Sequence, residues 1–132
     1  MKVFVISIEE ENSPRLTQFL NQPFFKNGQV PFKKFGIKGK DLTAKQYFEQ
    51  AVKGRSSPLT PGELGCTLSH LMALKFFLNT NENFALILED DAILPNDLTL
   101  INLEEEISKV NLPSNVLFIF LLIQMKECRK VR

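Results

Sequence analysis

The stretch LTPGELGCTLSHLMALKFFLNTNENFALILEDD, residues 59–91, contains a helix signal, a polar turn and an apolar strand in direct succession. Thr60, Pro61 and Glu63 combine a capping box with a proline at the first helical position. These residues predict a helix that begins at Thr60 and runs toward Leu78. A helix that is followed at once by a buried-type strand is characteristic of α/β folds.

The rest of the chain continues this alternation of strands and helices. We expect strands at residues 3–8, 30–37, 84–88 and 116–123. We also expect helices that start near residues 13, 43 and 98, the second with a capping box of Thr43 and Gln46 and the third with Leu98, Ile101, Ile107 and Val110 on its apolar side. The first strand, VFVISI, is apolar on both faces, which is typical of a central strand in a sheet that is covered on both sides. The sequence therefore predicts an α/β, Rossmann-like fold with a mostly parallel sheet and flanking helices.

The composition is that of an ordinary globular protein and favours one domain. Of the 132 residues, 44% are hydrophobic, and 16 Lys and Arg balance 15 Asp and Glu. A near-neutral chain is not drawn to DNA or RNA by counterion release, so we expect no nucleic-acid partner. Cys66 and Cys128 show neither a disulfide framework nor zinc-ligand spacing, which favours a reducing, cytoplasmic compartment. The start of the chain lacks the features of a signal peptide, and the run 116–123 is well short of the roughly 20 residues of a membrane span.

Three acids, Glu89, Asp90 and Asp91, follow the strand at residues 84–88. Open α/β sheets bind their ligands at the carboxyl ends of the strands, which is where these acids should lie. Because side chains alternate along an extended backbone, Glu89 and Asp91 should point to one side and Asp90 to the other. Two converging carboxylates predict a site for Mg²⁺ or Mn²⁺ shared with a diphosphate. The alternative is a solvated loop in which Asp90 caps local backbone.

The predicted helix from Thr60 carries a polar stripe of Glu63, Thr67 and His70 at helical spacing. It also carries a ribbon of small residues, which permits another backbone or a flat ligand to approach closely: Gly62, Gly65, Cys66, Ser69 and Ala73. Structural roles compete with functional ones here. Glu63 completes the capping box, and the lone histidine is a candidate for a packed residue that anchors the helix to a neighbouring strand.

Read in order, several segments resemble glycosyltransferase family 25, the lipopolysaccharide and lipooligosaccharide glycosyltransferases. The matching segments are VISI near the start, Arg15, FGIKGKDL, LTPGELGCTLSHL and FALILEDDAIL. The family's pattern includes ELGC, SH and EDD segments in that order, and their joint occurrence is far more specific than any one of them. The resemblance covers residues 1–110.

This resemblance implies a GT-A-like fold and a nucleotide-sugar transferase in which carboxylates hold Mn²⁺ (or Mg²⁺) against the donor diphosphate. It implies Glu89 and Asp91 as metal ligands, with Glu89 as an alternative ribose contact. It further implies a nucleotide-sugar site formed by Ile6, Ser7, Arg15, Glu63, Ser69, His70 and Asp90. Known members imply UDP-galactose as donor and a growing lipooligosaccharide as acceptor. The catalytic base is left unassigned.

We expect residues 1–112 to be the N-terminal, nucleotide-sugar-binding part of a glycosyltransferase domain, and residues 113–132 to be a divergent apolar and basic tail. The fold would then be incomplete, and the alternative function is a truncated, noncatalytic fragment that retains at most nucleotide-sugar binding. The tail, with Lys126, Arg129, Lys130 and Arg132, is also a candidate for peripheral contact with the inner face of the bacterial inner membrane. Metal-dependent phosphoryl transfer is disfavoured, because no P-loop or GxGxxG fingerprint occurs.

Overall fold

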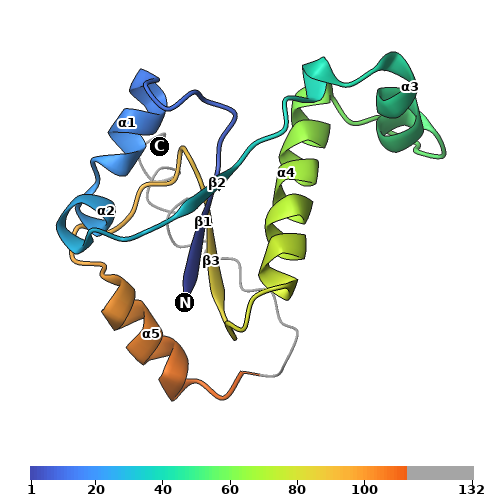
Figure 1. The fold of residues 1–132 in the computed structure, drawn as a ribbon. Coiled ribbons are helices and arrows are strands. Elements are labelled where there is room, and N and C mark those ends of the chain that lie inside the picture. Colours follow the sequence, from blue (N-terminus) through green and yellow to red (C-terminus); the bar gives the residue numbers. More distant parts are fainter. Residues whose placement is uncertain (113–132) are drawn as a thin grey trace, which may run out of the picture.

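Three parallel strands form the centre of the molecule in a computed structural model that describes residues 1–112 (Figure 1). The strands are β1 (Lys2–Ile6), β2 (Lys33–Phe35) and β3 (Ala85–Glu89), arranged in the order β2-β1-β3. Ile6 at the end of β1 is in register with Phe35 of β2 and with Glu89 of β3. All three strands therefore end at the same edge of the sheet, as predicted for an α/β, Rossmann-like fold.

Helices cover both faces of this sheet. Figure 1 shows α1 (Pro14–Leu20), α2 (Pro23–Gly28) and α5 (Leu100–Lys109) on one side and α4 (Pro61–Leu78) on the other. The segment between β2 and α4 forms a 3-10 turn, η1 (Gly39–Asp41), a short helix α3 (Ala44–Tyr47) and a π-helical turn η2 (Phe48–Val52). This segment lies beyond the N-terminal end of α4, away from the sheet (Figure 1).

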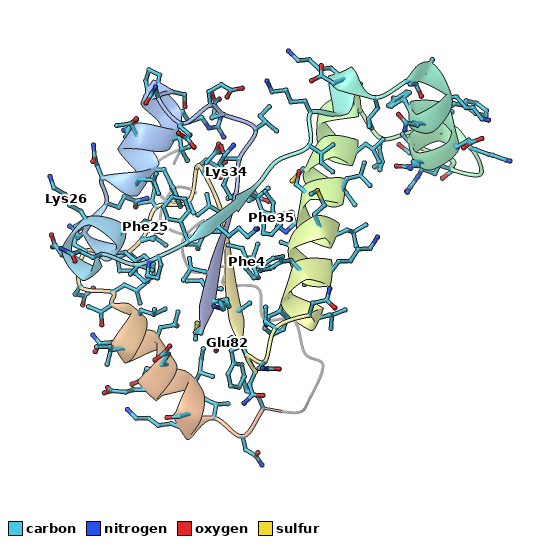
Figure 2. The ribbon with its side chains drawn as sticks, viewed as in Figure 1. Phe4, Phe25, Lys26, Lys34, Phe35 and Glu82 are labelled. Carbon is cyan, nitrogen blue, oxygen red and sulfur yellow. The ribbon has the colours of Figure 1, made fainter. Side chains whose placement is uncertain are left out.

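The side chains of β1 point alternately to the two faces of the sheet, and each set belongs to a different hydrophobic cluster. Val3 and Val5 join the cluster under α1 and α2, whereas Phe4 and Ile6 join a second cluster under α4. Figure 2 shows Phe4 and Phe35 in the layer between the sheet and α4, and Phe25 on the opposite side. The rings of Phe4 and Phe35 meet edge to face at 5.5 Å. A strand with both faces buried is thus what the sequence of β1 predicted.

The predicted start of α4 is confirmed in detail. The hydroxyl of Thr60 accepts a hydrogen bond from the backbone N–H of Glu63, and the Glu63 carboxylate accepts one from the Thr60 N–H at 2.8 Å. Pro61 occupies the first helical position. Thr43 and Gln46 form a second capping box at the start of α3, also as predicted.

Several predicted boundaries differ from the structure. The strand expected at residues 30–37 forms over only three residues, Lys33–Phe35. The helix α2 was missed, although Pro23 stands at its first turn, because it is short and its two phenylalanines, Phe24 and Phe25, gave no helical periodicity. The helix expected from Thr43 changes to a π turn at Phe48.

The apolar side of α5 was assigned in part to the wrong residues. The sequence predicted Leu98, Ile101, Ile107 and Val110, but Ile101 is 67% exposed and Val110 is 56% exposed. The structure instead packs Leu100 and Leu103 against the core, together with Leu98. The helix begins only after Thr99, whose side chain caps it, so the inward stripe starts at Leu100.

The small residues of α4 pack directly against the chain segment that follows β2. A Cβ atom on Gly65 would lie 2.5 Å from the carbonyl oxygen of Ile37, and one on Gly39 would meet the carbonyl of Pro61 even more closely. Ser69 adds a hydrogen bond, because its hydroxyl accepts from the Ile37 N–H at 2.8 Å. The close approach predicted for this ribbon is therefore made by backbone, over residues 37–39.

The strand predicted at residues 116–123 and the basic positions of the tail lie outside the described residues. Among the helices of residues 1–112, none has the length and apolar content needed to cross a bilayer.

Candidate functional site

A cleft of about 220 Å³ opens at the carboxyl edge of the sheet, beside the N-terminal half of α4. The strand order reverses at β1, since the chain adds β2 on one side of it and then β3 on the other. Open α/β sheets bind ligands at such switch points. The lining comprises Ile6, Ser7, Ile8, Glu9, Arg15, Ile37, Lys38, Gly39, Gly62, Cys66, Ser69, Glu89, Asp90 and Asp91.

Asp90 is the buried centre of the polar wall of this cleft. Its carboxylate accepts a hydrogen bond from Ser7 Oγ at 2.5 Å, and Arg15 donates to it from Nε at 2.9 Å and from Nη2 at 2.6 Å. The hydrogen bond from Arg15 to Asp90, assisted by the negative charge, raises the pKa of the guanidinium. Asp90 thus ties the end of β3 to the end of β1 and to the first turn of α1.

Glu89 points toward α4, opposite to Asp90. Its Oε1 lies 3.0 Å from His70 Nε2, and Cys66 Sγ donates to the same oxygen at 3.6 Å. His70 therefore anchors α4 to the end of β3, which is the structural role considered for it from the sequence. Burial, followed by the negative charge of Glu89, raises the pKa of the Cys66 thiol.

Asp91 is the acid of the turn that keeps its carboxylate available. It is exposed and lines the cleft, whereas hydrogen bonds engage one carboxylate oxygen of Glu89 and both of Asp90. Among residues 1–112 no side-chain hydrogen bond or ion pair engages Asp91. After the larger effect of Asp90, the negative charge of Asp91 also raises the pKa of the Arg15 guanidinium.

The structure brings most of the predicted nucleotide-sugar and metal residues together. Ile6, Ser7, Arg15, Ser69, Glu89, Asp90 and Asp91 all line the one cleft. Glu63 and His70 do not line it, because the carboxylate of Glu63 is used in the helix cap and His70 stands behind Glu89. Ser69 reaches the cleft, but its hydroxyl also donates to the Gly65 carbonyl and accepts from Ile37.

Sequence reasoning missed the contribution of the chain after β2. Lys38 lines the cleft, and its ammonium lies 3.9 Å from the carboxylate of Glu10. Lys34 reaches back from β2 and donates from Nζ to the backbone oxygen of Glu9 at 2.8 Å, which holds the loop after β1. The position of Lys38 after a predicted parallel strand could have indicated this contribution, since residues that follow such a strand lie at the same carboxyl edge of the sheet as the acids after β3.

A larger concavity, of about 300 Å³, lies at the opposite end of the sheet near Met1 and Phe84. Its charged groups pair with one another, because the Met1 ammonium lies 3.2 Å from the carboxylate of Glu82 and 3.0 Å from that of Glu104. It lies at the amino ends of the strands, where α/β sheets do not place their ligand sites. The cleft at the carboxyl edge is therefore the candidate site.

The sequence matches the family model described as glycosyltransferase family 25 (LPS biosynthesis protein) over residues 1–129. The chain belongs to glycosyltransferase family 25. The match extends past Val110, where the series of recognised motifs ends.

A curated relative of this family 25 chain comes from Haemophilus influenzae strain Rd and carries the description "Putative glycosyltransferase". The two sequences are 32% identical over 91 residues, which is 67% of this chain and 31% of the relative. The chain thus spans about a third of the length of the curated relative that it matches. No solved structure matches the chain.

The family 25 motif segments meet at the cleft although they are far apart in sequence. VISI ends β1, FGIKGKDL leaves β2, GELGC and SH lie on α4, and EDD ends β3. Each of these segments contributes at least one residue to the lining of the cleft. His70 of the SH segment does not line the cleft but contacts the side chain of Glu89. The motifs are therefore parts of one site rather than separate features of the sequence.

Proposed function

We propose that this chain forms the donor-binding portion of a metal-dependent glycosyltransferase, which transfers a sugar to a lipopolysaccharide or lipooligosaccharide acceptor. The donor would be UDP-galactose and the ion Mn²⁺ (or Mg²⁺). The observation that carries the proposal is the position of the EDD turn, which places two exposed carboxylates on the wall of a cleft at the sheet's switch point. Membership of family 25 supports the transferase chemistry.

The donor set fits a hard divalent ion. Glu89 and Asp91 offer carboxylate oxygens to the cleft, and both are exposed enough to be reached together with a substrate diphosphate. Mg²⁺ and Mn²⁺ prefer oxygen ligands and are often held by one or two carboxylates plus substrate phosphates. When bound, the ion would offset the negative charge that develops on the departing UDP.

The remaining residues would bind and orient the donor. The loop after β1, which includes Ser7, is fixed by Asp90, so the wall against which a nucleotide would lie is held in place before binding. Lys38 and Arg15 add positive charge at the rim and would attract the diphosphate. Ser69 and Gly65 hold residues 37–39 close to α4, which fixes the position of Lys38.

The second candidate is a noncatalytic fragment that binds the nucleotide sugar without transferring it. The observation that favours it is the coverage, since the chain corresponds to 31% of its relative. Transfer also requires residues that bind the glycosyl acceptor and a general base that takes the proton from its hydroxyl group. A galactose-transfer assay with an added oligosaccharide acceptor separates the two, because sustained turnover excludes the fragment.

Isothermal titration of UDP into the full chain, with and without Mn²⁺, tests the binding site. We expect binding that requires Mn²⁺, and we expect Asp91→Ala to weaken it by roughly tenfold or more, which corresponds to about 1.4 kcal/mol. Asp97→Ala removes an exposed carboxylate that does not line the cleft and serves as the matched control. Metal-independent UDP binding that Asp91→Ala leaves unchanged would remove the assigned role of the EDD turn.

A further inference from the structure

Three side chains of different chemistry converge beside the cleft. Cys66 and His70 stand one turn apart on α4, and Glu89 is the last residue of β3 opposite them. One ligand atom from each residue lies within 4.8 Å of the other two. Within residues 1–112 this is the one group of its kind.

Two of the three separations are close to those between ligands on one metal ion. Zn²⁺ holds sulfur at about 2.3 Å and histidine nitrogen or carboxylate oxygen at about 2.0–2.2 Å, so tetrahedral geometry sets ligand atoms roughly 3.2–3.6 Å apart. Here His70 Nε2 and Glu89 Oε1 are 3.0 Å apart, and Cys66 Sγ and the same oxygen are 3.6 Å apart. Small side-chain rotations would close the third side of the triangle, between Cys66 and His70.

The charge and accessibility of the group are also suitable. A thiolate and a carboxylate with a neutral imidazole supply two negative charges for a divalent ion. Cys66 and Glu89 line the cleft, so an ion could enter from it and keep one position open toward it.

We propose that Cys66, His70 and Glu89 form a binding site for a zinc-like divalent ion, with three protein ligands and a fourth position that faces the cleft. This site differs in chemistry from the manganese site proposed above, because it contains sulfur and imidazole nitrogen, which suit Zn²⁺ rather than Mn²⁺. Glu89 is shared between the two proposals. Cys66 and His70 belong to this one alone, and Asp91 belongs to the other alone.

Cysteine spacing in the sequence does not indicate such a site, because the cysteines are not paired at ligand spacing. The ligands instead come from one face of a helix and the end of a strand. The group exists because α4 packs across the sheet with Cys66 and His70 turned toward the end of β3.

Titration of the full chain with Co²⁺, in a non-thiol reductant and without oxygen, tests the proposal. Co²⁺ takes the place of Zn²⁺, and a bound thiolate gives it a sulfur-to-cobalt charge-transfer absorption in the near ultraviolet. We expect this band to appear at one equivalent and to be removed by Zn²⁺. Cys66→Ser should abolish the band, and His70→Ala should weaken Co²⁺ binding at least about tenfold, since even outer-shell changes cost that much.

Two control variants make the outcome specific. Cys128→Ser removes the other cysteine of the chain and should keep the band, and Thr67→Ala changes the same helix without touching the group. Asp91→Ala should keep the band even if it loses Mn²⁺-dependent UDP binding, which separates the two proposals. The proposal is overturned if no charge-transfer band forms, or if the band survives Cys66→Ser. Far-UV circular dichroism confirms that each variant retains its helices.

Discussion

Replacing Asp90 with alanine should destabilise the fold, because this acid joins three elements beneath the cleft. Its side chain is 8% exposed, and it receives hydrogen bonds from Ser7 and Arg15. The bond from the buried Ser7 hydroxyl to a charged carboxylate is worth about 1.5–3 kcal/mol. The pair with Arg15 adds little, about 0–1 kcal/mol, because the side chain of Arg15 is 56% exposed and solvent screens it. Removal of the carboxylate's own desolvation cost offsets part of the loss, so we expect about 2 kcal/mol.

Urea unfolding followed by far-UV circular dichroism measures this change. With a slope of about 1–3 kcal/mol per molar urea, a loss of 2 kcal/mol should lower the midpoint by about 1 M. Asp91→Ala is the matched control, since the neighbouring acid is exposed and has no side-chain partner in residues 1–112, and its effect should stay within about 0.5 kcal/mol.

A double-mutant cycle with Ser7→Ala isolates the contact itself. We expect a coupling free energy of about 1–2 kcal/mol between the two positions, because they share one hydrogen bond and are otherwise held by separate elements. Equal losses for Asp90→Ala and Asp91→Ala, or a coupling near zero, would refute the role given to Asp90 as the tie between β1 and β3.

Two further predictions concern the contact between α4 and the chain that leaves β2. Gly65→Ala should lower the free energy of unfolding in urea by about 1–3 kcal/mol, because the new Cβ would lie 2.5 Å from the carbonyl oxygen of Ile37. A Cβ at Gly62 meets nothing within 4 Å, so Gly62→Ala should be neutral or slightly stabilising. Equal effects of the two substitutions would show that the backbone approach at Gly65 is not tight. Ser69→Ala should lower the free energy of unfolding by about 1–3 kcal/mol, because it leaves the Ile37 N–H without its acceptor. Thr67→Ala, on the exposed side of the helix, should change this free energy by less than about 0.5 kcal/mol. A loss for Ser69→Ala that is no larger than the loss for Thr67→Ala would contradict the contact.

Local signals predicted the parts of the fold that depend on near neighbours in sequence. The start of α4 was predictable because a cap and its partner lie three residues apart, at Thr60 and Glu63. The position of β1 was predictable because both of its faces are apolar. The helix α2 was not predictable in this way, since its short apolar segment has no periodicity that distinguishes a helix from a loop.

The candidate site was predictable in its place but not in its internal contacts. The acids after β3 could be assigned to the carboxyl edge of the sheet, and the family resemblance indicated Ser7 and Arg15 as their neighbours. The sequence did not show that Asp90 is the acid those two residues bind, or that Asp91 lines the cleft without a side-chain partner among residues 1–112.

By itself, the sequence determined the parallel α/β core, the starts of α1, α3 and α4 and the location of an acidic turn at a strand end, because capping, periodicity and side-chain alternation act over a few residues. Only the tertiary structure decided which side chains meet. Ser7 and Asp90 are separated by 83 positions, and His70 and Glu89 by 19. Such pairs form because β1 and β3 are paired in register and because Gly65 of α4 lies directly against the backbone of residues 37–39. Neither condition can be read from residues that are close together in the chain.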